Sequence, residues 1–228
     1  MIVLAIDTSG PCAEIALRDG DERLATTSLR GAAHHSETLI VALDALLAHL
    51  RLGVNDIDLF ACTIGPGSFT GLRIGISTVL GLAEATGKAA IGVTTLEAVA
   101  FPYLNGAWPV AACLDAKRGQ IYAQVFRGGF GLADSDGDPR AWKPADFAAS
   151  LAEPTLVVGD GADAYRDVLR DSSNGRAVPV APGLCYHLAE SVAMIAERRA
   201  ATDAVTTPPI PLYVRSWDSG DAADPGPR

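Results

Sequence analysis

The chain has 228 residues, of which 49% are apolar and 20% charged, and its formal net charge is −9. This composition is typical of a globular protein with a large buried core, and it excludes a disordered chain. It also argues against a protein that binds nucleic acid on its own, because such proteins neutralise phosphates with a patch of lysine and arginine, and this acidic chain has no such patch.

The start of the chain and its cysteines indicate the compartment. The opening residues, MIVLAIDTSG, have no basic lead and reach Asp7 too early for a secretory signal, and no apolar run is long enough to cross a bilayer. Cys12, Cys62, Cys113 and Cys185 are widely spaced, which favours buried free thiols over zinc ligands or disulfides. We therefore expect a cytoplasmic protein without a membrane segment.

The first fifty residues predict strands followed by a helix. The segments IVLAID, CAEIALRDG and ERLATTSLR are separated by tight turns, which predicts a three-stranded meander. From Ser36 onward leucine recurs every three or four residues, the spacing of an amphipathic helix that ends near Leu50. This leucine stripe consists of Leu39, Leu43, Leu46, Leu47 and Leu50.

The stretch GPGSFTGLRIG, residues 65–75, follows the predicted strand DLFACTI and opens a second helix that runs to Thr86. A glycine turn before a helix presents unpaired backbone N–H groups, to which anions bind. No Walker lysine follows Gly67, however, and Ser68 is equally explained as the helix cap.

Glycines inside this second helix need an explanation, because each one costs about 1 kcal/mol relative to alanine. The glycine stripe consists of Gly67, Gly71, Gly75 and Gly81. Such a stripe lets another backbone approach closely. From the spacing alone, the close neighbour is either this chain's own first helix or sheet, or a second subunit.

The second half of the chain predicts another lobe. After AAIGV, the last predicted strand before residue 105, WPVAACLDA and GQIYAQVFRGG predict a hairpin. Residues 128–140 are then expected to form a loop, PTLVVGD a strand and LCYHLAESVAMIAERRA a helix. The prolines after Thr206 predict an extended tail that is frayed beyond Asp218. We therefore expect an α/β protein with an N-terminal lobe at 1–105, a C-terminal lobe at 106–205 and a tail at 206–228.

Several stretches together resemble known families. AIDTSGPCAEIAL resembles the first phosphate motif of the actin-like, hexokinase and heat-shock ATPase superfamily. HSETLI, GPGSFTGLRIG, VTTLEAVA, DAKRGQIY and PIPLYVR resemble, in this order, the bacterial TsaB (YeaZ) family. The resemblance implies tandem ribonuclease-H-like lobes, the second reduced, and a role in forming threonylcarbamoyladenosine on tRNAs that read codons beginning with adenosine.

The resemblance also implies partners. In that system the paralogue TsaD transfers the threonylcarbamoyl group and the ATPase TsaE assists, so we expect a heterodimer with a TsaD-like paralogue, a TsaE-like ATPase in the complex, a homodimer in isolation, and contact with tRNA only through the complex. The family's dimer contact uses the first two helices. Here it implies an interface of His35, Ser36, Leu39, Leu43, Leu46, Phe69, Gly71, Leu72, Gly75, Ile76 and Val79. A bulky residue at Gly71 or Gly75 is then expected to abolish pairing while the monomer stays folded.

The resemblance argues against catalysis by this chain. TsaD carries a His-x-x-x-His pair that binds a metal, and Thr95 and Val99 stand at those positions here. We therefore expect no metal ligand and no catalytic residue, with Glu97 as a surface or capping carboxylate.

Nucleotide binding and independent catalysis remain alternatives. Asp7, Thr8 and Ser9 occupy the phosphate-motif positions, which predicts weak ATP or ADP binding, although a strand-end aspartate that caps a turn explains them as well. A stand-alone ATPase of the superfamily is therefore the alternative function, whereas the missing histidines argue against a metallopeptidase. Asp115, Arg118 and Tyr122 of the predicted hairpin are interpreted as structural.

Overall fold

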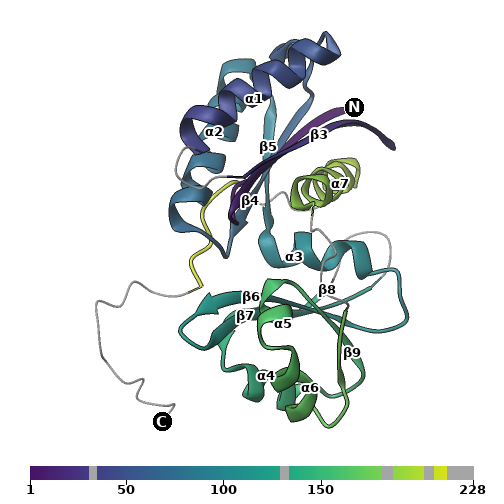
Figure 1. The fold of residues 1–228 in the computed structure, drawn as a ribbon. Coiled ribbons are helices and arrows are strands. Elements are labelled where there is room, and N and C mark those ends of the chain that lie inside the picture. The colour runs from purple at the N-terminus through teal and green to yellow at the C-terminus, as the bar shows by residue number, and fades with distance from the viewer. Residues whose placement is uncertain (31–34, 129–133, 181–186, 203–207, 215–228) are drawn as a thin grey trace.

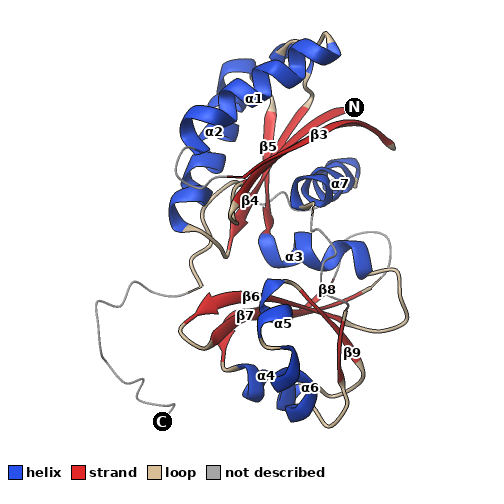
Figure 2. Ribbon diagram, viewed as in Figure 1, coloured by secondary structure: helices blue, strands red, loops and turns tan. Residues whose placement is uncertain are grey.

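The computed structural model describes residues 1–30, 35–128, 134–180, 187–202 and 208–214. The protein has two α/β lobes, each built on a five-stranded sheet (Figures 1 and 2). Within the described residues, no helix has the length and apolar character needed to cross a bilayer.

The N-terminal sheet has the strand order β3-β2-β1-β4-β5. Its strands are β1 (Ile2–Asp7), β2 (Cys12–Asp19), β3 (Glu22–Arg30), β4 (Leu59–Gly65) and β5 (Ala89–Thr94). The first three pair antiparallel, which confirms the predicted meander. β4 pairs parallel with both β1 and β5. The sheet is therefore mixed, with the meander on one side and two parallel strands on the other.

Helices cover both faces of this sheet, which explains why residues 2–6 of β1 are all apolar. α1 (His35–Leu50) and α2 (Phe69–Thr86) pack against Leu4 and Ile6 of β1 on one face. α7 (Leu188–Ala201) packs against Val3 and Ala5 on the other. Short elements complete the lobe: η2 (Val54–Asp56), α3 (Thr95–Ala100) and η3 (Phe101–Tyr103).

Both predicted helices of this lobe are present. Ser68 caps α2 because its hydroxyl accepts a hydrogen bond from the backbone N–H of Gly71 at 3.2 Å. Gly87, with a φ of 67°, ends the helix in the left-handed conformation that glycine adopts without strain.

The C-terminal sheet has the strand order β10-β9-β6-β7-β8. Its strands are β6 (Val110–Lys117), β7 (Gln120–Arg127), β8 (Asp134–Trp142), β9 (Thr155–Val158) and β10 (Ala177–Pro179). Its helices are α4 (Pro144–Ser150), α5 (Asp160–Ala164) and α6 (Arg166–Ser172). β6 and β7 form the predicted hairpin.

Two expectations are corrected by this architecture. The predicted loop at 128–140 overlaps β8, an edge strand that pairs with β7 across an irregular register and accommodates Gly137 at a φ of 70°. The predicted second lobe at 106–205 included α7, but Val192, Ala193 and Ala196 of α7 pack on the N-terminal sheet. The chain therefore returns to the first lobe after building the second (Figure 1).

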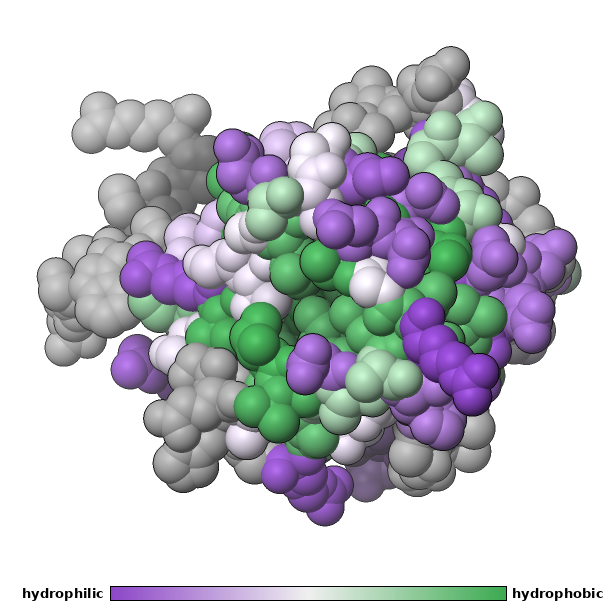
Figure 3. Space-filling view, turned by 90° about the horizontal axis from the view of Figure 1, so that it is seen from above, coloured by the Kyte–Doolittle hydropathy of each residue, from purple (hydrophilic) through white to green (hydrophobic). Residues whose placement is uncertain are grey.

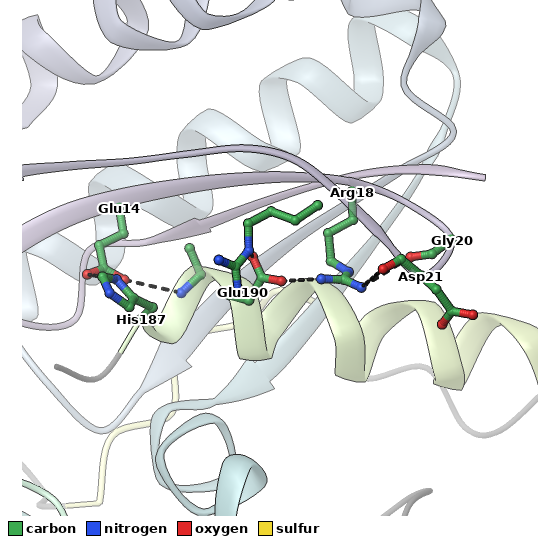
Figure 4. Close-up of polar contacts among 8 residues, drawn as sticks. Glu14, Arg18, Gly20, Asp21, His187 and Glu190 are labelled. Carbon is green, nitrogen blue, oxygen red and sulfur yellow. Dashed lines mark hydrogen bonds and ion pairs between the residues drawn. The ribbon is translucent and has the colours of Figure 1, made fainter. Parts of the chain in front are cut away.

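Polar contacts hold α7 on the N-terminal sheet (Figure 4). The buried Arg18 of β2 pairs with Glu190 of α7, and the Nε of Arg23 lies 3.0 Å from the same carboxylate. Glu14 of β2 accepts a hydrogen bond from the backbone N–H of Ala189 at 3.4 Å. Burial, and secondarily the charge of Asp7, raise the pKa of the Glu14 carboxyl.

Candidate functional site

The phosphate-motif turn, residues 7–9, lies at the carboxyl end of β1. Asp7, Thr8 and Ser9 are all buried. The Asp7 carboxylate accepts a hydrogen bond from the Thr63 hydroxyl at 2.6 Å and another from the backbone N–H of Ser9 at 3.0 Å. The aspartate therefore closes this turn and joins β1 to β4, as the capping interpretation predicts.

The glycine stripe of α2 packs against this turn. The Thr8 hydroxyl donates a hydrogen bond to the Gly71 carbonyl at 2.7 Å. A Cβ atom on Gly71 would lie 2.0 Å from the Thr8 carbonyl oxygen, and one on Gly75 would lie 2.3 Å from the Thr8 hydroxyl. A Cβ on Gly67 would lie 2.6 Å from the carbonyl oxygen of Ser9. The backbone N–H of Ser68 donates a hydrogen bond to the same oxygen at 2.7 Å.

The close neighbour of three of the four glycines is therefore this chain's own turn. The expectation that Gly71 and Gly75 form a partner surface is wrong, because no space remains beside them. Gly81 differs: a Cβ atom there would meet no atom within 4 Å.

Most of the apolar residues expected at the interface are also core residues. They fill the space between the two helices and the sheet, where they pack against β1, β2 and β4. The buried members are Leu39, Leu43, Leu72, Ile76 and Val79. Their assignment to an external contact is wrong, because their side chains are withdrawn from solvent inside one polypeptide.

The remaining interface residues differ from these. Leu46 is half-buried against the same core, whereas Phe69 is exposed to 44%. The side chains of His35 and Ser36 lie outside the described part of the chain.

The external surface of α1 and α2 carries a second set of apolar residues, of which only Phe69 was in the interface expected from the sequence. We call these residues the outer face: Ile40, Val41, Phe69 and Leu80. Val41 is exposed to 68%. Figure 3 views the molecule from the end at which α1 and α2 lie, and it shows apolar side chains gathered in the middle of that surface. The signal was present in the sequence, because apolar residues flank the leucine stripe at 40 and 41.

A groove of about 450 Å³ runs along the first three turns of α2, beside the outer face. It is lined by Phe69, Thr70, Arg73, Ile74, Ser77 and Thr78. The lining contains one cation, Arg73, and no carboxylate. The groove therefore offers one cation and three hydroxyl groups beside the apolar Phe69 and Ile74.

The segment compared with the metal-binding helix contains an ion pair. Glu97 is buried, and both of its oxygens accept hydrogen bonds from Nη2 of Arg199 on α7, at 2.8 and 2.7 Å. Burial raises the pKa of the Glu97 carboxyl and the guanidinium opposes that rise. The expectation of a surface or capping carboxylate is wrong, since Thr94 supplies the cap of α3.

The positions compared with the metal-binding histidines hold Thr95 and Val99. Both side chains are buried. Across the described residues, no three His, Cys, Asp or Glu side chains are grouped so as to hold a metal ion.

The β6–β7 hairpin is braced by its own aspartate. Asp115 accepts a hydrogen bond from the backbone N–H of Lys117 at 2.8 Å and pairs with the Lys117 ammonium at 2.7 Å. The backbone N–H of Asp115 donates to Asp160 at 3.0 Å, which joins the hairpin to α5. These contacts agree with the structural interpretation of Asp115.

Sequence comparisons find known proteins that are similar to this chain. A family model described as "TsaD: tRNA N6-adenosine threonylcarbamoyltransferase" matches residues 30–209. A protein of Escherichia coli named "tRNA threonylcarbamoyladenosine biosynthesis protein TsaB" is 32% identical over 178 residues, which cover 75% of this chain and 77% of that protein. The protein of the same name from Haemophilus influenzae is 34% identical over 56% of this chain and 55% of its own length.

Solved structures give the same result at the level of the fold. YeaZ from Pseudomonas aeruginosa superimposes with a TM-score of 0.76 at 26% identity, over 93% of this chain and 99% of that one. A ROK hexokinase from Thermus thermophilus has a TM-score of 0.54 at 12% identity, over 89% of this chain, which shows a shared fold alone. The chain has the two-lobed α/β fold of the actin-like ATPases and belongs to the TsaB (YeaZ) family.

Proposed function

We propose that this protein is a non-catalytic subunit of the bacterial complex that forms threonylcarbamoyladenosine on tRNA, where it binds and activates a TsaD-like paralogue through the outer face of α1 and α2. The observation that carries the proposal is the group of large apolar side chains exposed on these two helices, at Ile40, Val41, Phe69 and Leu80. Exposed apolar groups of this kind mark interaction surfaces in folded proteins.

This surface replaces the one expected from the glycines. The buried stripe of α2 faces Thr8 and is unavailable, whereas the opposite side of the same helix has the groove beside it. The first two helices remain the proposed contact, but with different residues. The same outer face serves for self-association in isolation, before the paralogue binds.

The non-catalytic role is supported by the polar residues of the N-terminal lobe. Glu97 is held by Arg199, and the Asp7 carboxylate is engaged by Thr63 and Ser9. Both acids therefore hold the chain's own elements together. In this proposal a TsaE-like ATPase joins the complex in the cytoplasm, and tRNA is contacted only through the assembly.

The alternative is a stand-alone ATP-binding or ATP-hydrolysing enzyme. Asp7 at the end of β1 favours it, because that position matches the first phosphate motif of the superfamily. The two proposals differ in a direct assay. Purified chain with ATP and no partner should show negligible turnover, whereas robust turnover that is lost in Asp7→Ala would favour the enzyme.

The interface proposal is tested with substitutions on the outer face. Val41→Asp combined with Leu80→Asp should weaken binding to the purified paralogue at least a hundredfold, because two charges would be buried against an apolar partner. Binding is measured by titration calorimetry, and the modified adenosine formed by the reconstituted complex is measured by mass spectrometry.

The matched control is Val168→Asp, since Val168 is exposed to 42% on α6 in the other lobe. It should leave both affinity and modification unchanged. Undiminished binding by the double variant, with the monomer folded, would exclude this surface.

A further inference from the structure

The C-terminal strap, residues 208–214, returns to the N-terminal lobe beside α2. The backbone N–H of Leu212 donates a hydrogen bond to the Ile64 carbonyl at the end of β4, at 2.7 Å. In Figure 1 the strap is the yellow segment that runs down beside the lower end of α2. The described part of the motif PIPLYVR, residues 209–214, therefore has a defined place in the fold, although the proposed function makes no use of it.

Two glycines allow the backbone of this strap to pack closely against the sheet. A Cβ atom on Gly65, whose φ is 115°, would lie 2.7 Å from the Leu212 carbonyl oxygen. A Cβ on Gly92 would lie 3.0 Å from the Pro208 carbonyl oxygen. The strap backbone thus lies against β4 and β5 at positions where a side chain would displace it.

Tyr213 connects the strap to the groove of α2. Its ring centroid lies 5.4 Å from that of Phe69, and its hydroxyl accepts a hydrogen bond from Nε of Arg73 at 3.3 Å. The Arg73 guanidinium carbon lies 3.9 Å from the Phe69 ring centroid. Arg73 is therefore stacked on the Phe69 ring and hydrogen-bonded to Tyr213. These two contacts restrict the rotamers of Arg73 before any partner binds.

Phe69, Arg73 and Tyr213 remain accessible to solvent although they contact one another. Phe69 is exposed to 44% and Tyr213 to 48%. Phe69 and Arg73 both line the groove. Among the described residues, Arg73 forms no ion pair with a carboxylate. A pre-oriented guanidinium beside half-exposed aromatic rings is the composition typical of residues that dominate binding energy at protein interfaces.

We infer that the C-terminal strap is part of the docking surface, with Tyr213 as the positioning residue that holds Arg73 ready to receive a carboxylate of the TsaD-like paralogue. The inference rests on the proposed function and extends it to a segment outside the first two helices. The occupant is the paralogue because the groove and the outer face share Phe69, so both belong to the surface that the proposed function assigns to that partner. A second copy of this chain is an outcome that the test distinguishes.

The test measures the affinity of the full chain for the purified paralogue. Tyr213→Ala should raise the Kd about tenfold and Tyr213→Phe about threefold, because the first removes ring and hydroxyl and the second removes the hydroxyl alone. Arg73→Glu should weaken binding more than Arg73→Ala. The control is Trp108→Ala, since Trp108 is also exposed to 48% but lies in the loop before β6; its Kd should stay within twofold of the unmodified chain.

A double-mutant cycle separates positioning from simple packing. If the Tyr213 hydroxyl acts through Arg73, Tyr213→Phe should have no further effect in the Arg73→Ala background. Equal effects in both backgrounds would overturn the positioning role. Tyr213→Phe keeps the ring, so it carries the test if Tyr213→Ala fails to fold.

The remaining outcomes are equally decisive. If the unmodified chain forms the complex and Tyr213→Ala leaves the Kd unchanged, the role of the strap in docking is overturned, but the proposed function is not. No complex with the unmodified chain would overturn the proposed function and this inference with it. If the variants weaken self-association in sedimentation experiments but leave the paralogue's affinity intact, the occupant is a second copy and the assignment to the paralogue fails.

Discussion

The two sides of α2 differ in how closely other parts of the chain pack against them. On its inner side Gly71 and Gly75 admit the backbone and side chain of Thr8, and a single added methyl group would overlap existing atoms. On its outer side Phe69 and Leu80 are exposed, and a groove leaves room for another chain. A stripe of small residues on a helix therefore indicates that another backbone packs closely against it. It does not indicate whether that backbone belongs to the same chain or to a partner.

The largest expected effect comes from filling the inner side. Gly71→Leu should destabilise the isolated monomer by more than about 3 kcal/mol, because even the Cβ atom would lie 2.0 Å from a backbone oxygen. Thermal or urea unfolding of the monomer measures this. A folded Gly71→Leu monomer of unchanged stability would mean that the turn at residues 7–9 can move to admit the side chain, and that the inner side of α2 is not closely packed.

A smaller effect is expected from Thr8→Val. The substitution removes the hydroxyl that donates to the Gly71 carbonyl and should reduce the free energy of unfolding by about 1 kcal/mol. Thr8→Ser keeps the donor and is the control. Equal losses in the two variants would indicate that the threonine methyl group, and not the hydrogen bond, holds α2 to the turn.

The smallest effect is expected at Gly81, where the stripe leaves the turn behind. Gly81→Ala should stabilise the monomer by about 0.5–1 kcal/mol, because alanine favours the helix and the added Cβ meets open space. Its affinity for the paralogue sharpens the comparison. Weaker binding despite a more stable monomer would show that this one glycine does serve a partner.

Much of the fold could be predicted because its signals are local. Strand runs with defined turns predicted β1 to β3, and the leucine period predicted α1. β8 was missed because its Asp-Gly-Asp-Pro sequence is typical of a turn, and only pairing with β7 extends it. The position of α7 could not be predicted, since an amphipathic helix does not specify which of two sheets it covers.

The candidate site was predicted less well than the fold. Phe69, expected at the interface, is exposed, but Leu39, Leu72 and Val79, expected there too, are core residues. The same apolar pattern fits both placements, because only the tertiary structure decides which side of a helix meets the sheet. The Glu97–Arg199 pair joins residues 102 positions apart, which spacing cannot reveal.

The return of α7 to the first sheet has a consequence for synthesis on the ribosome. Val3, Ala5, Leu59 and Ala61 are in the cluster that α7 completes, so much of this side of the sheet is exposed to solvent until residues 188–201 have emerged, although α3 already packs on part of it. The second lobe is complete in sequence by Pro179 and is free to fold earlier. A nascent chain stalled between these points carries a partly uncovered apolar sheet, the kind of intermediate on which chaperones act and which otherwise aggregates.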